Sequence, residues 1–166
     1  MTIFRNPITT GLTLTSTYAN PIVVVTTITN AGNTGALAAV YADSTTSWNV
    51  DNFGVIGDGG SSYGVRLKGG GNVFNGAPGA TDASIIGDSA GIYLSSGTVA
   101  NFGTVSSDSV GVLLNGTGVV RNGSAAAAIL GGEEGIVLSA GGTITNFGTI
   151  SSAGNYGQGI DFGHGK

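Results

Sequence analysis

The sequence predicts an all-β fold, a right-handed parallel β-helix (β-solenoid) with about 23 residues per coil and six to seven coils. Three observations support this prediction: a short motif recurs at near-constant spacing, the apolar residues come in short runs, and glycines separate those runs. The chain of 166 residues has 32 glycines but only 3 prolines. This composition favours short strands and tight turns over helices, because each glycine inside a helix costs ~1 kcal/mol.

The first motif is an asparagine that follows a valine or isoleucine by two positions. Successive copies are separated by 21 to 26 residues. We interpret them as a structural corner, where the side-chain amides of successive coils stack and hydrogen-bond along the solenoid. The predicted corner residues are Asn30, Asn52, Asn75, Asn101, Asn122 and Asn146.

The second motif is Gly-[Val/Ile]-x-Leu or a close variant, and it precedes a corner asparagine by 10 or 11 residues wherever both are present. Copies begin at Gly64, Gly91, Gly111, Gly135 and Gly159, with a degenerate copy at Ala39. Alternation within a strand predicts that the valine or isoleucine and the leucine point inward. Each coil then has three faces: this motif, the run that ends in the asparagine, and a third run that contributes Ile56, Val105 and Ile150 to the core.

Two types of coil alternate along the chain. Asn52, Asn101 and Asn146 are followed by Phe-Gly, whereas Asn30, Asn75 and Asn122 are followed by small residues. The repeating unit is therefore a pair of coils of roughly 47 residues, and inserts at 76–86 and 123–130 lengthen the second type. We expect each phenylalanine to lie beside a small residue of the next coil, which avoids a clash at a strand spacing of roughly 4.8 Å.

The two ends differ from the repeats. Residues 1–27 are predicted to form an N-terminal opening coil or cap that shields the first strand edge. Residues 28–166 form the β-helix repeats, and the C-terminal end stops after a first-face strand without a polar cap. We expect that end to continue into a longer solenoid or to be covered by another chain.

Composition argues against several classes of partner. The net charge is −4 with only five Lys and Arg residues, so the chain lacks the basic stripe that nucleic acid binding requires. No apolar run approaches the ~20 residues of a membrane helix, so we expect no membrane insertion by this segment. The chain has no cysteine, which excludes disulfides and thiolate metal sites.

The phrases Thr143–Ile150 (TITNFGTI) and Gly135–Leu138 (GIVL) resemble the passenger repeats of bacterial autotransporters and of haemagglutinin-like surface adhesins. The opening Thr10–Thr15 and Asn20–Val23 are similar to the start of such passengers, and the resemblance spans roughly residues 8 to 162. It implies a β-helix on the extracellular side or the outer surface of a Gram-negative bacterium, acting in adhesion or self-association. No export signal is recognised in this sequence.

No catalytic, cofactor or metal site is predicted. The acidic residues fall in turn segments, where they solubilise the protein, although Asp88 and Asp108 could stack on adjacent coils. Enzymes with a β-helix cluster acids with Arg, Lys or His on one face, but here Arg66, Lys68 and Arg121 are scattered and His164 lies in a glycine-rich tail. The acidic residues of these turns are Asp58, Asp82, Asp88, Asp108 and the Glu133–Glu134 pair.

Two surface uses are suggested by the sequence. Thr-x-Thr pairs at Thr13, Thr27 and Thr143 suggest an ice-binding ladder, but the coils between them lack such pairs. Arg66, Tyr93 and Asp161 should point outward from the first-face strands, with Tyr63 in the turn before them, and Tyr63, Arg66 and Tyr93 could contact sugars by stacking. The predicted function is therefore a noncatalytic adhesive or structural β-solenoid with a host-surface or glycan ligand. The alternatives are a fibre subunit that stacks end to end through its terminal coils and a polysaccharide-acting lyase or hydrolase.

Overall fold

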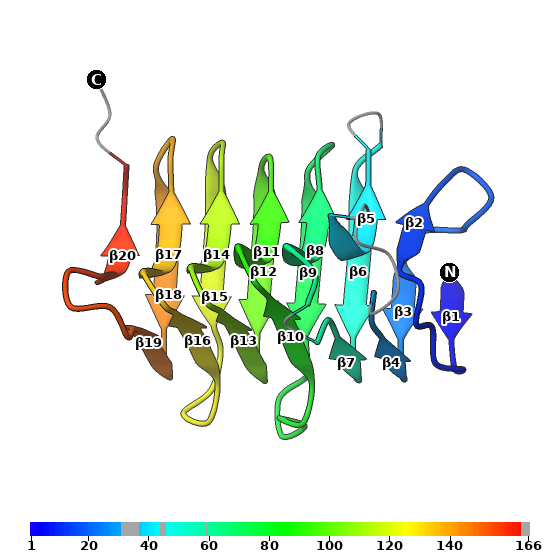
Figure 1. The fold of residues 1–166 in the computed structure, drawn as a ribbon, viewed down its shortest axis with the longest axis horizontal. Helices are drawn as coiled ribbons and strands as arrows, with labels where there is room; N and C mark the ends of the chain where they lie inside the picture. Colours follow the sequence, from blue (N-terminus) through cyan, green and yellow to red (C-terminus); the bar gives the residue numbers. More distant parts are fainter. Residues whose placement is uncertain (31–36, 44–45, 59, 164–166) are drawn as a thin grey trace.

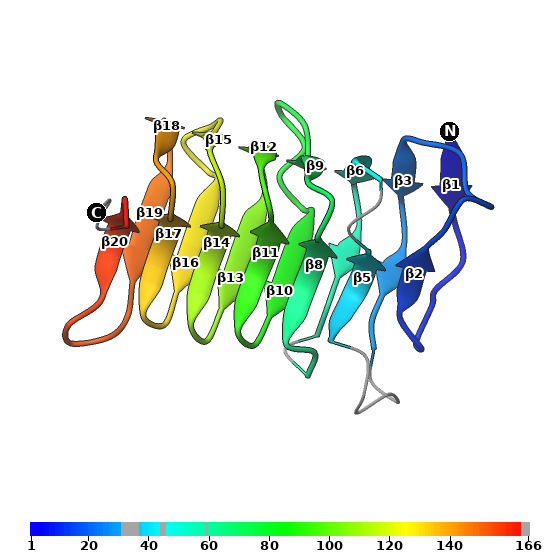
Figure 2. The ribbon, with the colours of Figure 1, turned by 90° about the horizontal axis from the view of Figure 1, so that it is seen from above.

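The computed structural model describes residues 1–30, 37–43, 46–58 and 60–163 and contains three parallel β-sheets that stack into a β-solenoid. The strands of successive coils lie side by side along the long axis, with one strand of each sheet per coil (Figures 1 and 2). None of the described residues lies in a helix, so this part of the chain has no helix that could cross a membrane.

The strands fall into three sets that repeat in chain order. Sheet A contains β1 (Thr2–Phe4), β3 (Ile22–Val24), β6 (Trp48–Asn52), β9 (Gly71–Asn75), β12 (Gly97–Asn101), β15 (Gly118–Asn122) and β18 (Gly142–Asn146). Sheet B contains β4 (Thr27–Ile28), β7 (Val55–Ile56), β10 (Ser84–Gly87), β13 (Thr104–Ser107), β16 (Ala128–Gly131) and β19 (Thr149–Ser152). Sheet C contains β2 (Leu12–Leu14), β5 (Ala38–Ala42), β8 (Tyr63–Leu67), β11 (Ala90–Leu94), β14 (Val110–Leu114), β17 (Glu134–Leu138) and β20 (Gln158–Asp161).

The predicted β-solenoid and its three faces per coil are confirmed. Sheet C carries the glycine motif, sheet A ends in the asparagine, and sheet B is the third face. Between Asn52 and Asn146 the coil length varies from 21 to 26 residues, as the sequence spacing predicts. Aliphatic side chains of all three sheets fill the interior as columns, and Val65, Ile85 and Val99 are each 0% exposed.

The glycine of the second motif is required by the corner between sheets B and C. A β-carbon built on Gly111 would lie 2.5 Å from the carbonyl oxygen of Gly135 and 2.8 Å from Cγ2 of Ile129. Gly64 is equally crowded, with Cγ2 of Ile85 at 2.7 Å. The position therefore faces the interior, and the residue after it faces inward as well, so strict in–out alternation is broken there.

The prediction for Asn30 is wrong, because the structure places this residue at a different corner. In sheet A, β3 pairs with β6 so that Val24 is opposite Asn52, while Ile28 pairs with Ile56 in sheet B. Asn30 therefore follows sheet B, where its amide donates to the carbonyl oxygen of Ala38 at 3.3 Å. Residues 28–30 have the Ile-x-Asn pattern of the motif but lie in a different part of the coil. The residue of this coil that is in register with Asn52 is the aliphatic Val24.

The alternation of phenylalanine with small residues has the predicted geometry at Phe102 and Gly123. Asn101 and Asn122 are opposite each other, so Phe102 lies beside Gly123. A β-carbon on Gly123 would be 2.5 Å from the Phe102 ring, which shows that the ring occupies the space over this glycine. The predicted inserts contain the loops that precede β10 and β16 and project from one edge of the solenoid (Figure 1), but their last residues, 84–86 and 128–130, already belong to these two strands.

The first coil is covered at its N-terminal side. β1 pairs with β3, and Ile8 makes a parallel bridge with Ile28. The rings of Phe4 and Tyr18 meet edge to face at 5.6 Å and pack against the core. In the last coil Ile144 and Ile150 are only partly buried, whereas their counterparts Val120 and Ile129 are 0% exposed.

Candidate functional site

The three residues predicted for surface contact lie together on the outer face of sheet C. The guanidinium carbon of Arg66 is 4.8 Å from the ring centroid of Tyr63 and 5.5 Å from that of Tyr93. The two tyrosine rings meet edge to face at 5.7 Å. All three side chains are half-buried, and we call this group the Tyr–Arg cluster (Tyr63, Arg66 and Tyr93).

The local fold explains why residues three apart in one strand share a face. Tyr63 and Arg66 both lie in β8, where strict alternation would put them on opposite faces. Because Gly64 is turned toward Ile85 and Val65 is also buried, two consecutive residues face inward. Tyr93 completes the cluster from β11, where it is the register partner of Arg66.

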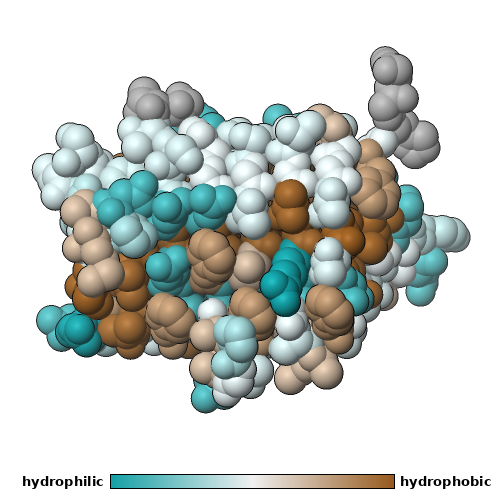
Figure 3. Space-filling view, turned by 180° about the vertical axis from the view of Figure 1, so that it is seen from behind, coloured by the Kyte–Doolittle hydropathy of each residue, from teal (hydrophilic) through white to brown (hydrophobic). Residues whose placement is uncertain are grey.

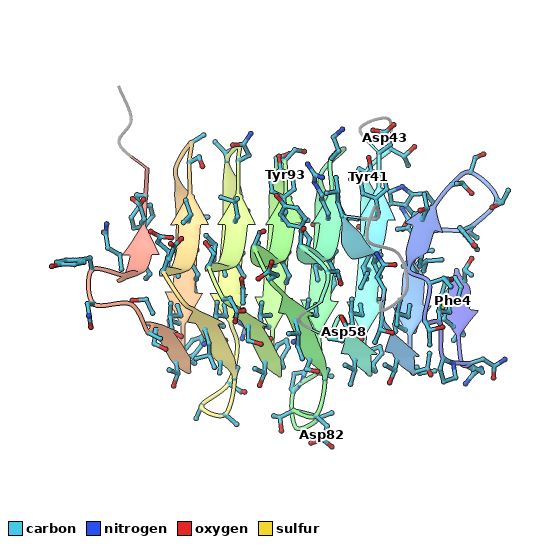
Figure 4. All side chains as sticks on the ribbon, in the orientation of Figure 1. Phe4, Tyr41, Asp43, Asp58, Asp82 and Tyr93 are labelled. Carbon is cyan, nitrogen blue, oxygen red and sulfur yellow. The ribbon has the colours of Figure 1, made fainter. Side chains whose placement is uncertain are left out.

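The outer row of sheet C continues the cluster toward the N-terminus. Tyr41 of β5 is the register partner of Arg66 on the other side, so an arginine lies between two tyrosines along the row. Figure 4 shows Tyr41 and Tyr93 on the same part of the sheet, with Asp43 at the nearby turn. Lys68 forms an ion pair with Asp43 at 3.7 Å between exposed side chains.

The charge of Arg66 is not matched by a carboxylate among the described residues, where the ion pair between Lys68 and Asp43 is the only one. The Nε atom of Arg66 is buried and has no hydrogen-bond partner in the described part of the chain. The tyrosine rings therefore hold the guanidinium by cation–π contacts, each worth ~0.5–1 kcal/mol at an exposed site. A ligand with an acidic group could contact the exposed part of this guanidinium directly.

The asparagine corner forms a continuous column from Asn52 to Asn146. Nδ2 of each asparagine donates to Oδ1 of the next at 2.8 to 2.9 Å, so the column runs in one direction. The same Nδ2 also donates to backbone carbonyl oxygens, as in Asn101 with Gly103 and Ala128, both at 3.0 Å. Asn52, Asn75, Asn101 and Asn122 are 0% exposed, and their hydrogen bonds explain how an amide is tolerated in the core.

The acidic residues of the turns are spread over several positions of the solenoid. Asp82 lies at the loop between β9 and β10, at the opposite edge from Tyr93 (Figure 4). Asp88 and Asp108 lie at equivalent turns, where the amide of Ser109 donates to the carbonyl oxygen of Asp88, and both side chains are exposed. The described residues contain no group of three or more His, Cys, Asp or Glu side chains that could hold a metal ion. His164 lies outside the described residues.

One acidic group at the start of β17 has a shifted pKa. Burial raises the pKa of the Glu134 carboxyl, and the neighbouring charges of Glu133 and Asp161 raise it further. Glu133 accepts a hydrogen bond from the hydroxyl of Ser109 at 2.7 Å. The arrangement concentrates negative charge at one turn.

The threonine pairs that suggested ice binding are on three different sheets. Thr13 lies in β2 of sheet C, Thr27 in β4 of sheet B and Thr143 in β18 of sheet A. They therefore cannot form one ladder.

A second surface was not predicted from the sequence. Phe53, Phe74, Phe102 and Phe147 form a row along the outside of sheet A and its corner with sheet B, and the row includes Arg121. Figure 3 shows apolar side chains gathered across this face, with isolated hydrophilic ones among them. The signal in the sequence was the residue before the asparagine, which is Phe74 in one coil and Arg121 two coils later.

Comparison with known proteins gives no relative: no protein-family model, no curated protein and no solved structure matches the chain. The fold therefore defines the class, a β-solenoid, and the function is inferred from its surfaces.

Proposed function

We propose that this chain is a noncatalytic, adhesive β-solenoid of a secreted or surface-displayed bacterial protein, and that it binds an acidic glycan through the Tyr–Arg cluster. The observation that carries the proposal is the contact of the Arg66 guanidinium with two tyrosine rings on the outer face of a sheet. The extracellular location follows from the resemblance of the repeats to autotransporter passengers.

The chemistry of the cluster suits a sugar that carries a carboxylate or sulfate group. Tyrosine rings stack on the apolar faces of sugar rings and keep a hydroxyl for hydrogen bonding. A guanidinium matches the two oxygens of a carboxylate or sulfate with a pair of parallel hydrogen bonds. Because the chain has a net charge of −4, an anionic ligand is attracted only where a local positive charge is exposed. Arg66 supplies that charge, because the neighbouring Lys68 is paired with Asp43.

Calorimetric titration with defined oligosaccharides tests this proposal. A galacturonate oligomer is the acidic probe, and a cellulose-derived oligomer of equal length is the neutral control. We expect binding of the acidic probe and a loss of about tenfold or more in Arg66→Ala, because hydrogen bonds to charged groups contribute ~1.5–3 kcal/mol. Tyr93→Ala should also weaken binding.

The matched control is Arg121→Ala, which removes the same charge from an exposed position on sheet A. It should leave the affinity for the galacturonate oligomer unchanged. Equal losses in the two arginine variants would show a nonspecific charge effect and would contradict the proposal. Equal affinity for the neutral oligomer would contradict the role assigned to the guanidinium.

The alternative of an end-to-end fibre has one observation in its favour, the partial exposure of Ile144 and Ile150 in the last coil. Sedimentation and electron microscopy over a range of protein concentrations distinguish it, since fibres of stacked subunits lengthen with concentration and an adhesin that acts as a monomer does not assemble.

The third candidate function, an enzyme acting on polysaccharide, predicts the ultraviolet absorbance of unsaturated uronate products when the protein is incubated with pectin or alginate.

A further inference from the structure

The phenylalanine row borders a hollow of about 340 Å³ on the outside of sheet A. Its walls are the rings of Phe53, Phe74 and Phe102, the turn after β9, and the side chain of Asp51. Phe53 and Phe74 are 47% and 41% exposed, so two aromatic rings are open to solvent on this face. The hollow is on a different sheet from the Tyr–Arg cluster.

The repeat pattern explains why a hollow forms here. Asn52, Asn75 and Asn101 are in register, so the residues that follow them, Phe53, Gly76 and Phe102, occupy equivalent corner positions. Gly76 has no side chain to cover the rings of the two flanking phenylalanines, and the backbone of the turn after β9 closes the corner, with the carbonyl oxygen of Ala80 2.8 Å from where a β-carbon of Gly76 would lie. The next pair of coils repeats this arrangement with Phe102, Gly123 and Phe147.

In that next pair a guanidinium lies near both phenylalanine rings. The carbon Cζ of Arg121 lies 5.9 Å from the ring centroid of Phe102 and 5.8 Å from that of Phe147. Phe74 occupies the register position of Arg121 two coils earlier, so in the first pair a third ring replaces the arginine. A guanidinium is therefore the group that Phe102 and Phe147 contact in this chain. The earlier pair of phenylalanines, Phe53 and Phe102, has no arginine at the equivalent position.

Asp51 provides the charge that a cation would need. It is the register partner of Phe74, so its carboxylate lies beside the aromatic rings. Burial raises the pKa of the Asp51 carboxyl, because the ionised form is partly removed from water. No described residue forms an ion pair with this carboxylate. A bound cation would offset the desolvation of the Asp51 carboxylate, and a planar cation would also stack its flat faces on the aromatic rings.

We propose that this hollow binds the guanidinium of an arginine side chain that a partner polypeptide presents. Guanidinium is favoured over ammonium because it is planar, stacks on aromatic faces and is more weakly hydrated. A purely apolar group would fill the hollow but would leave the Asp51 carboxylate desolvated and without a partner. The inference is independent of glycan binding by the Tyr–Arg cluster.

The experiment is a titration of the ¹⁵N-labelled protein followed by two-dimensional NMR. The probes are three tripeptides with blocked ends, Gly-Arg-Gly, Gly-Lys-Gly and Gly-citrulline-Gly, at millimolar concentration. Citrulline keeps the shape of arginine and removes its charge. We expect the arginine peptide to shift the amide signals of Phe74, Gly76 and Ala77, the lysine peptide to bind more weakly, and the citrulline peptide to cause no shift.

Variants assign the effect to named groups. Asp51→Asn and Phe74→Ala should each weaken binding of the arginine peptide about fivefold or more, because each removes one partner of the cation. Tyr93→Ala is the matched control, since it removes an outward aromatic ring from sheet C. Dispersed NMR spectra of the variants show that they remain folded.

Three outcomes overturn the proposal. The first is an absence of shifts with the arginine peptide. The second is an equal response to the citrulline or the lysine peptide. The third is unchanged affinity in Asp51→Asn. None of these outcomes bears on the galacturonate titration, so failure of the arginine site and failure of the glycan site are distinguishable.

Discussion

The side-chain amide of Asn101 donates to Oδ1 of Asn122 in the next coil at 2.9 Å, and both residues are fully buried. Asn101 also accepts a hydrogen bond from Asn75 at 2.8 Å, so it links the coils on both sides. Loss of this residue would leave several buried polar groups without partners, at ~1–3 kcal/mol each.

Replacing Asn101 by alanine should therefore lower the free energy of unfolding by at least ~2 kcal/mol. For a chain of this size that corresponds to a fall in the melting temperature of roughly 4–8 °C. Asp108→Ala, at an exposed turn, should stay within about 0.5 kcal/mol of the wild type. Thermal and urea unfolding followed by circular dichroism measure both, and equal effects would refute the structural role of the column.

The second prediction concerns the glycine at the corner of sheets B and C. Gly111→Ala would force its β-carbon against a backbone oxygen at 2.5 Å and Ile129 at 2.8 Å. Overpacking of this kind costs ~1–3 kcal/mol, so the variant should unfold at lower urea concentration. Gly159 occupies the same motif position in β20, but a β-carbon there would meet only one backbone oxygen, at 3.5 Å. Gly159→Ala should be nearly neutral, and a similar loss in both variants would contradict the packing explanation.

The third prediction uses the charge concentration at Glu134. Because its pKa is raised in the folded state, first by burial and then by Glu133 and Asp161, ionisation of this group opposes folding. The folded state holds the proton more tightly, so stability falls as the pH rises through the titration range of this carboxyl, and the penalty is fully present above the raised pKa. Glu134→Gln should raise the melting temperature at pH 7, and the gain should shrink as the pH is lowered through the titration range of the carboxyl.

The control for that experiment is Asp82→Asn, which removes an acidic group at the exposed loop between β9 and β10. It should show little gain at either pH. Since burial is the larger cause at Glu134, most of the gain should persist when salt is added. A gain that salt abolishes would mean that repulsion, and not desolvation, is the main cause.

The fourth prediction concerns the contact between Arg121 and Phe147. A double-mutant cycle with Arg121→Ala and Phe147→Ala should give a coupling energy of about 0.5–1 kcal/mol, the range of an exposed cation–π pair. The control cycle combines Arg121→Ala with Val119→Ala. It should give a coupling energy near zero, because Val119 has no aromatic ring for the guanidinium to contact. Coupling that is equal in the two cycles would show that the ring contact has no specific contribution.

The repeat phase and the core were predictable because both depend on local pattern. Alternation identified Val65 and Leu67 as inward, and the spacing of the motifs identified the faces. The position of Asn30 was not predictable from its motif alone, since a three-residue pattern carries no information on which strand it pairs with. Only the register of Val24 with Asn52 shows that the first coil has an aliphatic residue at the corner.

The surface sites depend on relationships that a sequence shows only after the register is known. Arg66 and Tyr93 were predicted to face outward, whereas Tyr63 was predicted in the preceding turn and instead begins β8; the contact among the three requires the turned glycine at position 64. The hollow beside Asp51 depends on which residues of three different coils are neighbours. Phe74 and Arg121 are separated by 47 positions in the chain, and their equivalence becomes visible only through the pairing of β9, β12 and β15.

The pairing of a large with a small corner residue sets a rule for changing the length of this rod. Duplicating one coil would put Phe102 beside another phenylalanine, or Gly123 beside another glycine, whereas duplicating two adjacent coils preserves the order. Growth or shortening of the solenoid, in evolution or by design, should therefore proceed in even numbers of coils. A variant extended by one coil and a variant extended by two would separate the rule from simple tolerance of added length, because only the second keeps a phenylalanine next to a glycine at each junction of coils.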